Sequence, residues 1–170
     1  MRHAHCLRIL AGILAALAAP PAAFAIGEGQ PAPAYDIRLL DGQQFSATRE
    51  AGHVVMLHFW ASWCVPCRAE MPAMERYYRA HHAQGFDLVA VSMDSPEDLD
   101  KARALMKQYS FPGAWIQEAS VRGYGRIWRI PLTFVIDRQG MLRHDAWDGG
   151  DAGITDAVLD QTITPLLEAK

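Results

Sequence analysis

The chain has 170 residues, of which 51% are hydrophobic and 21% charged, and its formal net charge is −3. A weakly acidic chain without a basic block does not fit the class of proteins that bind nucleic acid through a positive surface. The length suffices for one domain with a buried core and is too short for two.

Residues 1–25 have the pattern of a cleavable signal peptide. Arg2 and Arg8 belong to a basic start, the eleven residues 9–19 are small and apolar, and the segment closes on Ala-Phe-Ala, a typical cleavage signal. Because a membrane-spanning helix needs about 20 apolar residues, we expect cleavage before Ile26 and export to the periplasm, with a retained membrane anchor as the alternative. The mature chain then has 145 residues and, with 14 basic against 19 acidic side chains, a net charge of −5.

After this segment the sequence alternates between strand and helix patterns. Residues 26–33, rich in Gly and Pro, are expected to form a flexible lead-in, and residues 34–170 one domain. Asp41-Gly42 is a hairpin turn signal. Strands are expected at 35–40, 44–46, 54–60, 86–93, 114–117, 133–137 and 141–147, and helices at 66–84, 95–109, 120–127 and 154–167. Strands that alternate with helices in this way predict an α/β fold.

Cys64 and Cys67 carry the clearest chemical signal. They lie in Trp63-Cys64-Val65-Pro66-Cys67, directly after the apolar strand 54–60. A cysteine at the start of the following helix places its sulfur near free backbone N–H groups, which stabilise a thiolate. The second cysteine, one turn later, is within reach of a disulfide. The pair can therefore alternate between dithiol and disulfide, as thiol–disulfide exchange requires.

Zinc binding is the alternative for a C-x-x-C pair. A structural zinc site needs four ligands, commonly a second cysteine pair or two spaced histidines. The other cysteine, Cys6, lies in the expected signal peptide, and His81 and His82 are adjacent. We therefore expect a redox pair, no metal site, and no cofactor besides the redox-active Cys64–Cys67 disulfide.

Two motifs resemble a known family. The segment 59–72, FWASWCVPCRAEMP, resembles the active-site segment of the thioredoxin superfamily, and more narrowly that of the exported TlpA/ResA-like thiol–disulfide oxidoreductases. The segment 130–137, IPLTFVID, is similar to the second signature of that family. The resemblance covers residues 34–170. It implies a thioredoxin-like fold: a central mixed β-sheet flanked by helices, with an N-terminal β-hairpin and a central helix–strand insertion around residues 95–117.

The resemblance also implies roles for these residues. Cys64 would be the exposed nucleophile that attacks a substrate disulfide, and Cys67 would resolve the mixed disulfide. Pro131 would follow a cis peptide bond and face the cysteine pair; its alternative is an ordinary strand-initiating proline. The implied substrate contacts are Trp63, Pro66 and the backbone of Ile130. Val65 and Arg129 depart from the family pattern, and Val65, between the cysteines, leaves the redox potential open.

Two titratable side chains are candidates for moving the Cys67 proton. Glu70 lies one turn beyond Cys67 on the same helix, where a partly buried carboxylate with a raised pKa could accept it. The alternative is a solvated glutamate favoured by the helix dipole. His58 stands on a strand that is apolar on both faces, so we expect a buried, neutral ring that could share this task. Its alternative is a core histidine bonded to a backbone carbonyl.

The implied function is that of an exported protein-disulfide reductase. Its clients would be proteins with oxidised cysteine pairs, in cytochrome c maturation or copper-site assembly, and a membrane electron-transfer protein would recharge it. A thiol oxidant or disulfide isomerase is one alternative. A copper-binding or chaperone-like module that uses the same thiols is the other. We expect a monomer that has no nucleic-acid partner.

Overall fold

The computed structural model describes residues 26–145 and 153–169. The expected signal peptide and the end of the strand expected at 141–147 lie outside these residues. The strands are β1 (Asp36–Leu39), β2 (Gln44–Ser46), β3 (Val54–Trp60), β4 (Phe86–Ser92), β5 (Gly113–Ser120), β6 (Leu132–Ile136) and β7 (Leu142–Asp145). The helices are α1 (Val65–His81), α2 (Leu99–Met106), α3 (Asp156–Thr162) and α4 (Thr164–Glu168), with short 3₁₀ turns η1 (His82–Gln84) and η2 (Arg122–Tyr124).

The strands form one mixed seven-stranded sheet in the order β2-β1-β5-β4-β3-β6-β7. β3 runs parallel to β4 and antiparallel to β6, so it lies near the middle of the sheet. All seven residues of β3 are buried, as the apolar run predicts for a strand covered on both faces. The expected α/β class and the N-terminal hairpin of β1 and β2 are confirmed.

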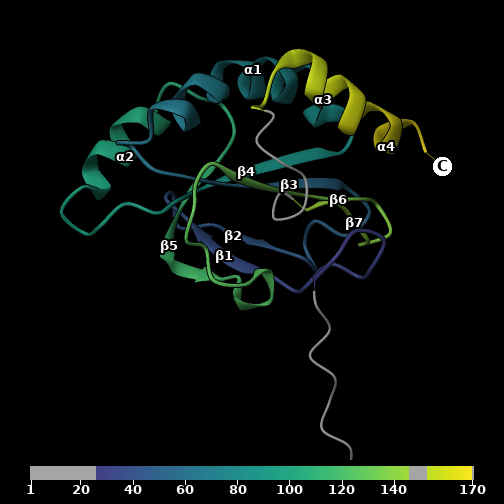
Figure 1. The fold of residues 1–170 in the computed structure, drawn as a ribbon, viewed down its shortest axis with the longest axis horizontal. Helices are drawn as coiled ribbons and strands as arrows, with labels where there is room; N and C mark the ends of the chain where they lie inside the picture. Colours follow the sequence, from purple (N-terminus) through teal and green to yellow (C-terminus); the bar gives the residue numbers. More distant parts are fainter. Residues whose placement is uncertain (1–25, 146–152, 170) are drawn as a thin grey trace, which may run out of the picture.

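Helices α1 to α4 lie together over one face of the sheet (Figure 1). Beneath them, apolar side chains of α1 such as Met71 and Met74 pack with Met56 and Trp60 of β3 in one core cluster. The opposite face carries a second cluster, which includes Phe59 and Phe134 and is closed by Tyr124 of η2. In the described part of the chain, no helix is both long and apolar enough to cross a lipid bilayer.

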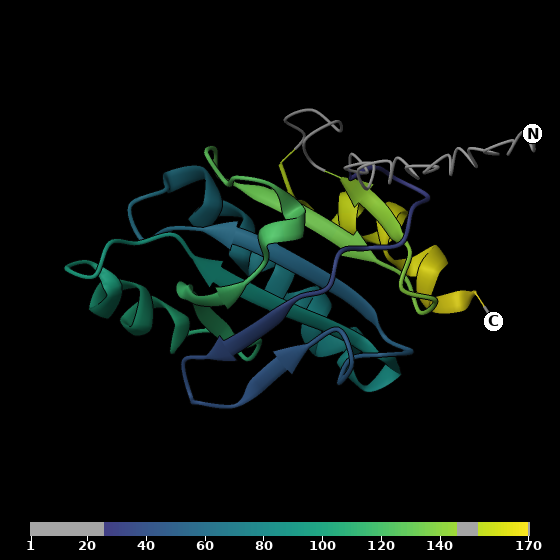
Figure 2. The ribbon, with the colours of Figure 1, turned by 90° about the horizontal axis from the view of Figure 1, so that it is seen from below.

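Residues 26–33, the expected lead-in, are hydrogen-bonded to the sheet. The backbone of Gly29 and Gln30 exchanges hydrogen bonds with Leu142, at 2.8 and 2.9 Å, so the segment pairs with the outer edge of β7. Figure 2 shows this purple segment beside the light-green strand. Its far end is held as well, because the Tyr124 hydroxyl donates a hydrogen bond to the Pro33 carbonyl at 2.8 Å. Segment 26–33 is therefore part of the folded domain.

The region between β4 and β6 departs most from the expected elements. The helix expected at residue 95 begins at Leu99, because residues 95–98 form a turn closed by the Asp98 N–H on the Ser95 carbonyl. The N-cap of α2 is Asp98, whose side chain makes no capping hydrogen bond. The helix expected at 120–127 is only the 3₁₀ turn η2, and β5 extends to Ser120 because β1 pairs with its far half.

Candidate active site

The two cysteines lie at the start of α1, joined by a disulfide, with their Cα atoms 5.3 Å apart. Cys64 is the N-cap of the helix, and its sulfur accepts a hydrogen bond from the Cys67 backbone N–H at 3.3 Å. Pro66 occupies the first turn, where the missing N–H costs no helical hydrogen bond. The strand-to-helix geometry inferred from the motif is therefore confirmed.

The nucleophile is less accessible than expected. Cys64 is 4% exposed and Cys67 is fully buried at 0%, so the predicted exposed thiol is a buried one in this disulfide form. Cys64, at the amino end of α1, is the more accessible of the two cysteines.

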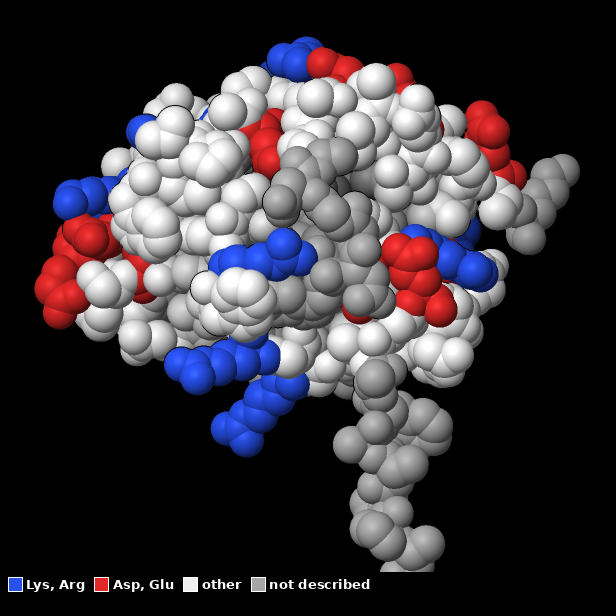
Figure 3. Space-filling view, in the orientation of Figure 1, with Lys and Arg blue, Asp and Glu red and all other residues white. Residues whose placement is uncertain are grey.

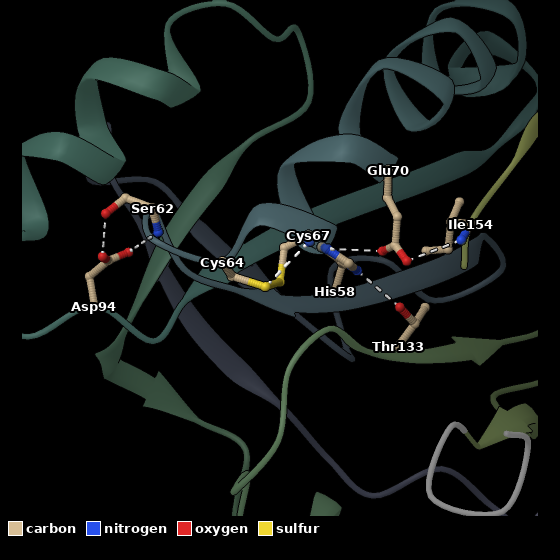
Figure 4. Close-up of a disulfide and its surroundings, with 8 residues drawn as sticks. All are labelled: His58, Ser62, Cys64, Cys67, Glu70, Asp94, Thr133 and Ile154. Atoms are coloured by element: carbon tan, nitrogen blue, oxygen red, sulfur yellow. Dashed lines mark hydrogen bonds and ion pairs between the residues drawn. A yellow bond between two sulfur atoms is a disulfide. The ribbon is translucent and has the colours of Figure 1, made fainter. Parts of the chain in front are cut away.

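A buried aspartate fixes the loop that carries Cys64. The Asp94 carboxylate, at the carboxyl end of β4, accepts hydrogen bonds from the Ser62 backbone N–H at 2.8 Å and from the Ser62 hydroxyl at 2.6 Å (Figure 4). It also accepts one from the Ser92 hydroxyl at 2.7 Å, and it is 1% exposed. These bonds hold the backbone two residues before Cys64.

The second signature lies against the first. The Ile130–Pro131 peptide bond is cis, as the resemblance implied. β6 pairs antiparallel with β3 so that Leu132 lies opposite Phe59, which places Pro131 beside the carboxyl end of β3, where the active-site loop begins. Ile130 packs against the core cluster that contains both cysteines.

Exposed apolar side chains flank the cysteine pair in the sequence. Trp63 is 62% exposed and Val65 is 65% exposed, on either side of Cys64. Trp60, in contrast, is fully buried in the core. Trp128, three residues before the cis-proline, is 73% exposed. Sequence reasoning did not single out Trp128; the signal that could have found it is an aromatic residue close to the second signature.

Glu70 lies behind Cys67 and is buried. Its Oε1 accepts a hydrogen bond from the Ile154 backbone N–H at 3.1 Å, whereas its Oε2 has no hydrogen-bond partner. Burial raises the pKa of Glu70 to about 7, against a smaller lowering by the Ile154 bond. The alternative of a solvated surface glutamate is therefore wrong, and the carboxyl group changes its charge near neutral pH.

His58 and Glu70 face each other on the Cys67 side of the disulfide (Figure 4). The His58 Nε2 and the Glu70 Oε2 are 3.9 Å apart, and neither atom has a hydrogen-bond partner. The other ring nitrogen, Nδ1, lies 2.9 Å from the Thr133 hydroxyl. Burial lowers the pKa of His58 to about 3, so the ring is neutral at physiological pH, as predicted.

Thr133 is a site residue that sequence reasoning missed. It lies opposite His58 in the β3–β6 pairing, so its hydroxyl bonds the ring rather than the backbone carbonyl we expected for a core histidine. A pairing between strands far apart in the chain is not visible in either motif. The side chains of Glu70, His58 and Thr133 therefore form one buried group, brought together by α1, β3 and β6.

On the face shown in Figure 3, basic side chains gather below the middle and acidic side chains lie mainly nearer the edges, over a largely uncharged surface.

The chain belongs to the AhpC/TSA family, whose model matches residues 28–145. It is 36% identical over 121 residues to the thioredoxin-like protein YneN of Bacillus subtilis, covering 69% of this chain and 70% of that protein. It is 30% identical over 119 residues to the thiol-disulfide oxidoreductase ResA of Geobacillus thermodenitrificans, covering 70% and 68%. A thiol:disulfide interchange protein of the thioredoxin family from Chlorobium tepidum superimposes with a TM-score of 0.70 at 25% identity, covering 84% of this chain and 99% of that one.

These similarities, together with the disulfide at the start of α1, define the class. The protein has a thioredoxin-like fold and is a ResA-like thiol–disulfide oxidoreductase.

Proposed function

We propose that this protein is an exported reductant of protein disulfides, active in the periplasm. The observation that carries the proposal is the group of Glu70 and His58 buried behind Cys67. A resolving thiol that is shielded from water needs a base inside the protein, and a carboxyl group with a pKa of about 7 can serve as that base near neutral pH. The expected signal peptide supports export.

The proposed reaction transfers two electrons to the client. The Cys64 thiolate attacks one sulfur of the client disulfide, forms a mixed disulfide and releases the first client thiolate. Glu70 then accepts the Cys67 proton, and the Cys67 thiolate attacks Cys64. The second client thiolate leaves, and the enzyme keeps the Cys64–Cys67 disulfide. The reaction needs no cofactor, and a membrane electron-transfer protein would return the pair to the dithiol.

The backbone of Ile130 is proposed to pair with an extended client segment, with Trp63 and Pro66 forming the apolar rim beside Cys64. Trp63 is 62% exposed, which suits a client-facing role. We propose clients with closely spaced oxidised cysteines, of the kind found in haem-attachment sites or copper sites, and a monomeric enzyme.

The reduction potential of the pair tests the direction. We expect equilibration with glutathione buffers of known ratio to give the Cys64–Cys67 pair a potential below about −220 mV, in the range of cytosolic reductants. A potential near −120 mV, typical of a strong oxidant, would instead assign the protein to disulfide formation. Retention of one copper ion per chain after dialysis, without any disulfide reduction, would support the copper-binding alternative.

A further inference from the structure

A second group of polar side chains lies at the opposite end of β3. Glu50 and His53 come just before this strand, and Asp87 is the second residue of the neighbouring β4. Because β3 and β4 are parallel, with Val55 opposite Asp87, these residues meet at the amino end of both strands. The cysteines follow the carboxyl end. A strand of seven residues separates the two sites by about 20 Å.

The potential ligand atoms of Glu50, His53 and Asp87 all lie within 4.8 Å of one another. The His53 Nδ1 is 2.5 Å from the Asp87 Oδ2, and a carboxylate oxygen of Glu50 lies close to both. The Asp87 side chain is 9% exposed and the His53 ring is 45% exposed. The group is therefore buried at Asp87 and open to solvent at His53. Two carboxyl groups and an imidazole thus converge on one small volume.

Neighbouring residues hold this group in place. The His82 Nδ1 lies 3.3 Å from the other oxygen of Asp87, and its ring stacks on Tyr78 with centroids 4.6 Å apart. Arg138 donates hydrogen bonds to the carbonyls of Gly52 at 3.1 Å and Gln84 at 2.9 Å, which joins the loops on either side. Such outer contacts orient metal ligands in known sites.

From this geometry we propose that Glu50, His53 and Asp87 form a binding site for a divalent transition-metal ion, with zinc as the ion of best fit. One imidazole nitrogen and carboxylate oxygens are ligands that zinc takes at about 2.0–2.2 Å. The ligands of a tetrahedral zinc ion lie about 3.4 Å apart, so the His53 Nδ1 and the Asp87 Oδ2, now 2.5 Å apart, would separate slightly to admit the ion. A hard ion such as Mg²⁺ prefers oxygen ligands alone.

The C-x-x-C pair lacks the further ligands of a structural zinc site, which is why no metal is expected from the sequence. The group of Glu50, His53 and Asp87 contains no cysteine, and its members are joined by the pairing of β3 with β4 rather than by a local motif. The proposed site also does not depend on the proposed function, because it shares no residue with the thiol site.

The test is a zinc titration of the full chain with its disulfide intact, against a fluorescent zinc indicator. We expect Glu50→Gln and His53→Gln each to weaken zinc binding at least about tenfold, the scale seen when a site loses a supporting contact. The matched control is His144→Gln, since that imidazole also faces a carboxylate, with its Nδ1 3.9 Å from the Glu28 Oε1. It should bind zinc like the unmodified chain. His3, His5 and Cys6 are common to all four proteins and give a constant background.

Crystals soaked in zinc provide a second readout that does not depend on variant folding. An anomalous peak bonded to His53, Glu50 and Asp87 is expected. Equal zinc affinity in all four proteins, or no peak at this position, would overturn the proposal and leave a hydrogen-bonded group that only shares protons. Disulfide reduction should proceed at the same rate in His53→Gln as in the unmodified chain, whether or not the direction proposed above is correct.

Discussion

The two oxygens of the Glu70 carboxyl group have unlike surroundings, and this difference decides how the residue responds to pH. Oε1 is bonded to the Ile154 backbone, whereas Oε2 faces the neutral ring of His58 without a hydrogen bond. An ionised carboxylate at this position loses more hydration free energy than its hydrogen bond to Ile154 restores. This loss raises the pKa of Glu70 to about 7. The proton is therefore held by the folded chain over a range in which the unfolded chain has released it.

This gives a stability prediction for Glu70→Gln. The folded state binds more protons than the unfolded state between the ordinary pKa of 4.5 and about 7, so the free energy of unfolding of the unmodified chain should fall as the pH rises through this window. Glutamine keeps an acceptor for the Ile154 N–H and does not ionise. Urea unfolding at pH 5 and pH 8 should therefore show the variant gaining stability relative to the parent at pH 8. The exposed Glu118→Gln is the control and should show no such gain.

The same carboxyl group should control the rate of exchange. With Glu70 as the base for Cys67, the rate of reduction of a model disulfide should rise with an inflection near pH 7 and lose that inflection in Glu70→Gln. Stopped-flow measurements from pH 5 to 9 test this. An unchanged profile would mean that the Cys67 proton goes elsewhere.

His58 is expected to act through Glu70. Because its pKa is about 3, the ring does not titrate between pH 5 and 9, and it can only move the inflection of its neighbour. His58→Asn should shift that inflection, and Thr133→Val, which removes the partner of Nδ1, should shift it in the same direction. The double change His58→Asn with Glu70→Gln should be non-additive. Strictly additive effects on the rate would assign His58 to the core.

The roles of the two sulfurs give a trapping prediction. Cys67→Ser should accumulate mixed disulfides with client proteins, because Cys64 can attack and nothing can resolve the product. Cys64→Ser should not, because its remaining thiol is fully buried. Non-reducing gels of cell extracts provide the measurement, and equal trapping by both variants would contradict the assignment.

At the scale of elements, the active site depends on the loop between β3 and α1, which Asp94 ties to the carboxyl end of β4. Asp94→Asn leaves one acceptor oxygen for three hydrogen bonds from Ser62 and Ser92. The loss of a buried charged acceptor should cost about 1–3 kcal/mol in the free energy of unfolding, and it should slow disulfide reduction by loosening the backbone before Cys64. Asp98→Asn, which removes only a surface pair with Lys101, is the control and should change stability by less than about 1 kcal/mol.

Some of the helices and strands can be predicted from the sequence, and others cannot. β3 and α1 were predicted well because an apolar run and a proline-marked helix start are local signals. The β5 extension and the 3₁₀ turn η2 were not, because β5 owes its length to pairing with β1, far away in the chain. The active site shows the same difference. The Cys64–Cys67 pair lies in one short sequence motif, whereas Thr133 and Asp94 are brought to it only by the pairing of β3 with β6 and β4.

For the whole molecule, the pairing of segment 26–33 with β7 has a consequence for association. Without it, β7 would present free backbone donors and acceptors at the margin of the sheet, a surface on which a second copy can add its own strand. Residues 29–32 already use the hydrogen-bonding groups of Gly140 and Leu142. A chain that starts at Ala34 should therefore form dimers or larger aggregates as its concentration rises, visible by light scattering, whereas a chain that starts at Ile26 should not. That result would mean that residues 26–33 protect the sheet edge at β7 from pairing with a second copy.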